Sequence, residues 1–206
     1  MMCCFITIGH AYKGENAGAS FDGFGEVAMV RRYVAALRGR LMELGWAVSV
    51  SDKNRYSADK AACDAMGAKV YINAHLNAGM GGRDSQRGEI FYDYQTSQQN
   101  GIALATTVAR RLDDALPFAV LAKRCRPDTN GVPRDGDYSE AYGCIAGVKA
   151  VALCIEPFFI DGAHRSELRT EAGLDRIGVL IAEGINDWDG APPSALHIDG
   201  YSQEPL

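Results

Sequence analysis

The chain has 206 residues, 47% hydrophobic and 23% charged, which is typical of one globular domain with a substantial core. Its formal net charge of −5 at pH 7 argues against a nucleic-acid partner, because phosphate binding usually requires a basic stripe. No apolar run reaches the roughly 18 residues that a membrane span requires, so we expect no transmembrane segment.

An apolar segment at 3–8 opens the chain and predicts a strand covered on both faces. The first ten residues, MMCCFITIGH, lack the charged start and long apolar stretch of a signal peptide, so we expect synthesis in the cytoplasm without an export signal. A glycine-rich loop then leads to Glu26, where apolar residues at spacings of three and four predict a helix up to Leu44. Because glycine permits sharp turns, this loop can bring His10, at the strand end, beside Glu26.

Strands and helices alternate along the rest of the chain, which predicts an α/β fold with a largely parallel sheet and helices on both faces. Residues 125–147 are irregular, and so long a loop in a compact domain is usually functional or mobile. We expect one domain at 1–189 and a tail at 190–206. Further strands are predicted at 46–51, 69–74, 89–94, 118–123 and 148–155, and helices within 51–67, 102–116 and 174–188.

Cysteine and motif patterns exclude several classes of site. The six cysteines form no Cys-x-x-Cys pair, and several lie in apolar runs, where Cys packs as a small hydrophobic residue. We therefore expect thiols rather than disulfides. The sequence has neither the GxSxG elbow of serine hydrolases nor the GxxxxGK[ST] loop that binds phosphate.

A metal-binding set of residue types follows the predicted strands. His75 comes directly after the strand at 69–74, as His10 does after the first strand. Sites in parallel sheets form beyond the carboxyl ends of the strands, so we expect the two imidazoles to lie close together. With Glu26 they would form a His₂Glu set for one zinc ion, with a position left for water.

Glu156 is the candidate general acid/base. Zinc lowers the pKa of its water to about 7 and polarises a carbonyl, and a second carboxylate must then move the proton to the leaving nitrogen. Glu156 ends an apolar strand, and Pro157 favours an extended backbone there. The other histidines, His164 and His197, follow no strand, and we expect them to be ordinary surface or core residues.

Three short blocks resemble a known family. IGHxxKGxxxGxxxxGxxE resembles the first block of the zinc-dependent N-acetylmuramoyl-L-alanine amidases of the amidase-3 type. INAHLNA resembles their second-histidine block, and ALCIEPFFIDG resembles their final strand with its catalytic Glu. The blocks agree with the family in order and approximate spacing, and the resemblance extends over residues 5–188.

The resemblance implies a three-layer α/β/α sandwich around a mixed, mostly parallel sheet of about six strands. It implies one zinc ion bound by His10, Glu26 and His75, with Glu156 as the general acid/base. The substrate it implies is peptidoglycan, cleaved at the amide between N-acetylmuramic acid and the L-alanine of the stem peptide. The family's usual DPGHGG is TIGHAY here, so Tyr12 is a candidate to line the site in place of glycine. Asn77 and Arg83 lie in the loop that follows His75, and both are candidate contacts of the substrate.

Two other functions stay open from the sequence. One is a zinc carboxypeptidase-like peptidase, whose substrate carboxylate would need an arginine; the other is a wall-binding module that has lost catalysis. The arginines available to a peptidase are Arg55, Arg124, Arg126 and Arg134.

The compact chain without an export signal suits a phage-type endolysin, and we expect a monomer.

Overall fold

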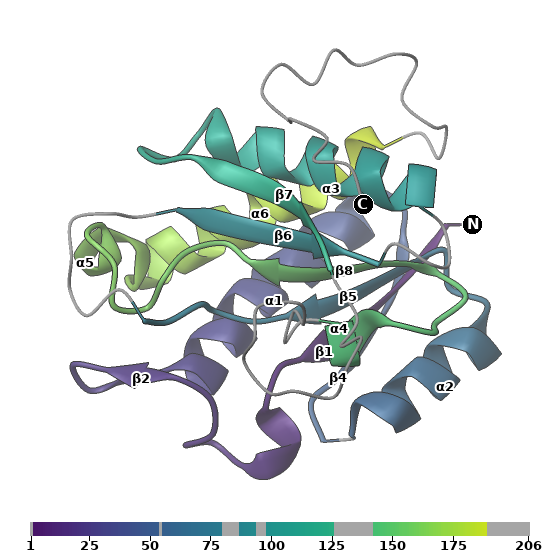
Figure 1. The fold of residues 1–206 in the computed structure, drawn as a ribbon, viewed down its shortest axis with the longest axis horizontal. Coiled ribbons are helices and arrows are strands. Elements are labelled where there is room, and N and C mark those ends of the chain that lie inside the picture. The colour runs from purple at the N-terminus through teal and green to yellow at the C-terminus, as the bar shows by residue number, and fades with distance from the viewer. Residues whose placement is uncertain (1, 54, 80–86, 94–97, 126–141, 189–206) are drawn as a thin grey trace, which may run out of the picture.

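A computed structural model of the chain describes residues 2–53, 55–79, 87–93, 98–125 and 142–188. The main sheet has six strands: β1 (Cys3–Ile8), β4 (Ala47–Ser51), β5 (Val70–Ala74), β6 (Gly88–Tyr92), β7 (Val120–Arg124) and β8 (Val151–Glu156). Their order across the sheet is β4-β1-β5-β8-β6-β7 (Figure 1). The first four in that order are mutually parallel, whereas β6 pairs antiparallel with β8 and parallel with β7. The sheet is therefore mixed and mostly parallel, as predicted.

Helices cover both faces of the sheet and complete the three-layer α/β sandwich that was predicted (Figure 1). Successive side chains of a strand point to opposite faces of the sheet, so the strands contribute to two separate hydrophobic cores. Ile72 and Leu153 belong to one core, and Tyr71 and Cys154 belong to the other. The first core lies under α1 (Glu26–Glu43), α3 (Gln98–Asp113) and α6 (Glu171–Asp187), and the second under α2 (Tyr56–Met66) and α4 (Tyr142–Ile145).

Close packing of α1 against α6 fixes the helix that carries Glu26. A methyl group at Gly178 of α6 would lie 2.7 Å from the backbone nitrogen of Leu37, so only glycine allows this approach. In the same helix pair, Tyr33 is fully buried, and its hydroxyl donates a hydrogen bond to the His75 carbonyl at 3.0 Å. Helix α1 is thereby tied to the end of β5, where His75 lies.

Several short elements were not predicted. The glycine-rich loop contains a 3₁₀ turn, η1 (Ala11–Lys13), and a hairpin of β2 (Ser20–Phe21) and β3 (Phe24–Gly25). The one-turn helix α4 lies in the segment at 125–147 that was predicted to be irregular, α5 (Arg165–Leu168) lies where no element was predicted, and β8 begins at Val151 rather than at 148. Elements of two to four residues are too short for a periodic pattern. Residues 126–141 of the predicted long loop and the predicted tail at 190–206 lie outside the described residues.

Among the helices that the structure describes, none combines the length and the apolar character needed to cross a membrane. All six cysteines lie in described residues and are thiols, five of them buried.

Candidate metal centre and active site

Two imidazoles and one carboxylate meet at the carboxyl edge of the parallel strands. Nδ1 of His75 lies 3.0 Å from Oε1 of Glu26, and Nε2 of His10 lies 3.9 Å from its Oε2. The two imidazole rings are edge to face, with centroids 4.8 Å apart. One ligand atom from each of the three residues can be chosen so that all lie within 4.8 Å of one another. The structure thus brings together the three residues expected to bind the metal.

Two glycines make room for this cluster. A methyl group at Gly18, where φ is +81°, would overlap Oε2 of Glu26 and lie 2.9 Å from Cδ2 of His10. At Gly9 it would lie 2.5 Å from Nδ1 of His75. Glycine is therefore required at these two positions, because side chains of the site occupy the space that a Cβ would need.

Glu26 is held in place by the loop and by the end of β5. It is 2% exposed, its Oε2 accepts a hydrogen bond from the Ala19 N–H at 2.7 Å, and its Oε1 accepts one from the Leu76 N–H at 3.2 Å. Burial alone raises the pKa of Glu26, but the hydrogen bonds with His75 and Ala19 and the nearby imidazoles outweigh it, so its pKa is lowered. The carboxyl group is therefore ionised at neutral pH, as a metal ligand must be.

His10 occupies an uncommon backbone conformation that Tyr56 supports. Its φ is +59°, in the left-handed region, where residues other than glycine are rare. The N–H of His10 donates a hydrogen bond to the Tyr56 hydroxyl at 3.2 Å, and that hydroxyl also lies 3.3 Å from Nε2 of His75. Tyr12 packs edge to face against Tyr56, with ring centroids 5.6 Å apart. One phenol therefore positions both candidate histidine ligands.

The thiol of Cys144 is a further neighbour of the His75 ring, in addition to Glu26, His10 and Tyr56. Burial lowers the pKa of His75, but hydrogen bonds with Cys144 and with Glu26 raise it more, so its pKa lies above the ordinary value. Cys144 belongs to α4, in a segment that was predicted to be irregular, and no sequence pattern indicates that its thiol lies beside this histidine.

Glu156 lies beside His75 at the end of the adjacent strand. The His75 N–H donates a hydrogen bond to the Ile155 carbonyl at 2.9 Å, and Glu156 is the next residue. Burial raises the pKa of Glu156 to about 7; His75 opposes this rise, and the negative charges of Glu89 and Glu26 add to it. This is the range in which a carboxyl group both accepts and donates a proton near neutral pH.

Glu89 is a site residue that the sequence reasoning missed. It lies opposite Glu156 in the antiparallel pairing of β6 with β8, and it is 4% exposed. Its carboxylate accepts hydrogen bonds from Arg87 Nε at 2.7 Å and Lys123 Nζ at 3.0 Å, and from Asn77 Nδ2 at 2.9 Å. Glu89 lies at the start of β6, whereas the expectation for parallel sheets is that site residues follow the carboxyl ends of the strands. Glu89 lies at the same edge of the sheet as Glu156 because β6 runs antiparallel to β8.

The other candidate residues have mixed outcomes. Asn77 lies at the edge of the site, with its side-chain amide bonded to Glu89. Arg83 and His197 lie outside the described residues, as do two of the arginines considered for a peptidase, Arg126 and Arg134. His164 directly precedes the short helix α5 and stacks against Phe118, with ring centroids 5.7 Å apart.

The donor set fits a catalytic metal ion. Two imidazoles with one carboxylate form a known three-ligand set for zinc, which leaves a position for water. The ionised Glu26 and the space kept free by Gly9 and Gly18 fit the same interpretation. The residues present could therefore hold one zinc ion between His10, Glu26 and His75.

Comparisons with known proteins point in the same direction. The family model of N-acetylmuramoyl-L-alanine amidase matches residues 4–187, and no curated protein matches the sequence. Among solved structures, Cwp6 from Clostridium difficile has a TM-score of 0.74 at 18% identity, covering 91% of this chain but 29% of that chain. N-acetylmuramoyl-L-alanine amidase AmiC2 of Nostoc punctiforme has a TM-score of 0.73 at 15% identity, covering 91% of this chain and 96% of that one.

A third similar structure is the catalytic domain of the CD27L endolysin targeting Clostridia Difficile, with a TM-score of 0.66 at 21% identity over 91% of this chain and 98% of that one. At these identities the structural likeness establishes the fold, which is the fold that the resemblance of the three sequence blocks implied. The family itself rests on the sequence match, which extends over most of the chain. The chain therefore belongs to the N-acetylmuramoyl-L-alanine amidase family of peptidoglycan hydrolases.

Proposed function

We propose that this chain is a zinc-dependent amidase that cleaves the bond between N-acetylmuramic acid and the L-alanine of the stem peptide. The observation that supports the proposal most is the convergence of His10, Glu26 and His75 within 4.8 Å. It lies within a chain that the amidase family model matches from residue 4 to residue 187. We propose likewise that residues 1–189 form the catalytic domain, that 190–206 form a tail and that the protein acts as a monomer.

A zinc ion at this site supplies a Lewis acid that polarises the scissile carbonyl and activates water. The contribution of the protein is to hold the ligands ready before the ion binds. Glu26 is fixed by two backbone N–H groups, and His10 and His75 share the Tyr56 hydroxyl. A ligand set organised in this way needs little rearrangement when it binds the metal.

Glu156 then moves the proton. We propose that its carboxylate accepts a proton from the attacking water and that the resulting carboxylic acid donates it to the nitrogen of the departing L-alanine. A pKa of about 7, set first by burial, suits both directions of transfer. The position of Glu156 as the last residue of β8, next to His75 at the end of the neighbouring strand β5, supports this role.

Asn77 and Arg83 stay proposed contacts of the substrate. For Asn77 the structure favours an indirect role, because its amide holds Glu89, and Glu89 faces Glu156. For Arg83 the support is its place in the loop that follows His75.

The proposal is tested by replacing Glu156 with Gln and measuring both turnover and bound zinc. Removal of a positioned general acid/base typically costs about 10²–10⁴-fold in rate. We expect Glu156→Gln to lose turnover to that extent and to keep one zinc ion, while Glu167→Gln, which changes an exposed carboxylate on α5, behaves like the wild type. Unchanged turnover in Glu156→Gln would contradict the assignment. Shortening of stem peptides only at their carboxyl ends would favour a peptidase, and binding to cell walls without cleavage would favour an inactive module.

We further propose that the biological setting is phage lysis. The support is the fold shared with the catalytic domain of an endolysin. The protein would then be made in the host cytoplasm and would reach the wall only after the membrane is opened. Expression in a bacterial host should therefore cause lysis only when the inner membrane is permeabilised, and lysis without permeabilisation would contradict this setting.

A further inference from the structure

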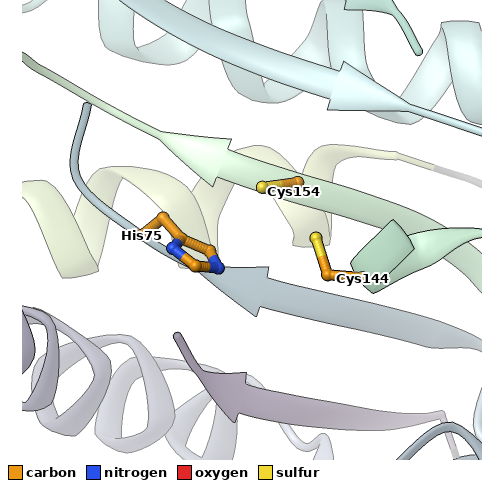
Figure 2. Close-up of side chains that lie close together, drawn as sticks. All are labelled: His75, Cys144 and Cys154. Carbon is orange, nitrogen blue, oxygen red and sulfur yellow. The ribbon is translucent and has the colours of Figure 1, made fainter. Parts of the chain in front are cut away.

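A second cluster of metal-binding side chains adjoins the first. His75, Cys144 and Cys154 are all buried, and one ligand atom from each lies within 4.8 Å of the others. Figure 2 shows the imidazole and the two thiols close together, His75 just after β5, Cys154 on β8 and Cys144 on α4. The thiol of Cys144 is in hydrogen-bonding contact with both the Cys154 and the His75 side chains.

The fold explains why these residues meet. Asn73 pairs with Cys154 in the register of β5 with β8, and side chains two residues apart along a strand share a face of the sheet. His75, two residues after Asn73, therefore lies on the same face as Cys154. Helix α4 lies against this face and contributes Cys144, and Lys60 of α2 anchors α4 by donating hydrogen bonds to the Gly143 and Ala146 carbonyls.

Two thiolates and one imidazole are a recognised ligand set for zinc, and thiolate ligands select thiophilic ions. With zinc–sulfur bonds of about 2.3 Å and zinc–nitrogen bonds of about 2.0–2.1 Å, tetrahedral geometry separates two sulfur ligands and one nitrogen ligand by roughly 3.5–3.8 Å. The three ligand atoms already lie within 4.8 Å of one another, which is close to these separations. We propose that His75, Cys144 and Cys154 form a second site, specific for thiophilic ions such as Zn²⁺, that shares His75 with the amidase site.

Sharing one histidine makes the two sites alternatives. In the amidase set His75 faces Glu26 through Nδ1, at 3.0 Å. An ion that draws His75 towards the thiols leaves His10 and Glu26 as the only ligands of the amidase site, which is too few for a catalytic zinc centre. Excess zinc therefore inhibits the enzyme by occupying the site that contains the two cysteines.

Buried cysteines often act only as small hydrophobic residues, so the test needs a signal that packing cannot produce. Co²⁺ replaces zinc at such sites, and a thiolate bound to Co²⁺ gives a charge-transfer absorption in the near ultraviolet. The amidase set contains no sulfur, so this absorption cannot come from the amidase site, and the cysteine variants show which thiols produce it. The signal does not depend on amidase activity, and failure of the proposed function would leave it unchanged.

The experiment titrates Co²⁺ into the wild-type protein and into four variants. The expected result is a charge-transfer absorption in the wild type and in His10→Ala, which lacks a ligand of the amidase site only. The absorption should be lost in Cys144→Ala and in Cys154→Ala. Cys63→Ala is the matched control, because Cys63 is fully buried in the same apolar cluster and belongs to neither site, and it should keep the absorption.

Circular dichroism confirms that each variant is folded before the spectra are compared. Bound Co²⁺ without a charge-transfer absorption in the wild type would overturn the proposal, as would an absorption that survives either cysteine substitution. A second measurement uses zinc and peptidoglycan: Cys154→Ala should need at least about tenfold more zinc than the wild type for half-inhibition, since loss of a ligand weakens metal binding by at least that factor. Equal sensitivity to zinc would count against the inhibitory role.

Discussion

Glu89 lies directly opposite Glu156 where β6 runs antiparallel to β8. Three donors hold the Glu89 carboxylate in place, so its negative charge stays next to Glu156. After burial, which is the largest effect, this charge contributes to raising the pKa of Glu156 to about 7. Glu89 is therefore a positioning residue that acts on Glu156 through the electric field, without touching the reacting atoms.

Replacing Glu89 with Gln should shift the pH dependence of catalysis. The change removes a negative charge and leaves Arg87 and Lys123 in place, so the pKa of Glu156 falls. Because Glu156 must be ionised to accept a proton, the acidic limb of kcat/KM should move to lower pH. The measurement is a pH profile of both proteins in the same zinc-loaded form. An unchanged limb, or a limb that moves to higher pH, would show that Glu89 does not influence the base.

Substitution of Gly18 separates backbone strain from crowding of the metal site. Gly18→Ala and Gly23→Ala both place alanine at a positive φ, +81° and +79°, but only the first directs its methyl group at Glu26. The strain common to both should cost roughly 1 kcal/mol. Crowding should lower the free energy of unfolding of Gly18→Ala by about a further 1–2 kcal/mol and should also weaken its zinc affinity. Urea unfolding and zinc titration measure the two effects, and equal behaviour of the two variants would contradict the role assigned to Gly18.

Removal of the Tyr56 hydroxyl should weaken metal binding without removing a ligand. Tyr56→Phe loses the hydrogen bond to the His10 N–H and the contact with Nε2 of His75. Loss of such a supporting partner typically costs about 10–100-fold in metal affinity. Tyr12→Phe is the control, since Tyr12 packs on Tyr56 through its ring. Competition with a chromophoric chelator gives the affinities; wild-type affinity in Tyr56→Phe would mean that the histidines need no such support.

His75→Ala should abolish zinc binding at the amidase site. His75 is the residue closest to Glu26 in the cluster, and its loss leaves two ligands. We expect affinity to fall by more than the roughly 100-fold that marks the loss of a supporting residue. His164→Ala removes a histidine that stacks on Phe118, and it should keep full zinc content by elemental analysis. Full occupancy in His75→Ala would contradict the ligand set.

Sequence patterns predicted most of the sheet because its central strands β1, β5 and β8 are almost entirely buried and therefore apolar on both faces. The strand at 3–8 and the helix that begins at Glu26 were predicted at the positions where β1 and α1 are found. The reversed direction of β6 and β7 could not be derived from alternation of strands and helices, because alternation alone favours parallel strands. The mixed character of the sheet followed only from the family resemblance.

The residues of the candidate site were likewise only partly predictable from the sequence. His10, His75 and Glu156 were expected to lie together because each follows a strand, and Glu26 because a glycine loop can fold back on itself. Glu89 and Cys144 escaped prediction for different reasons. Glu89 reaches the site because β6 is antiparallel, and Cys144 because a one-turn helix too short for any periodic signal packs on β5 and β8. Both depend on long-range contacts that no local pattern encodes.

The most direct test of the account is mass spectrometry of purified peptidoglycan digested by the protein, before and after zinc is removed by a chelator and restored. We expect the digest to contain stem peptides with a free L-alanine amino terminus, and we expect these products to be lost on chelation and recovered with added zinc. Intact sacculi under all conditions, peptides shortened only at their carboxyl ends, or the same products in the presence of the chelator would contradict it.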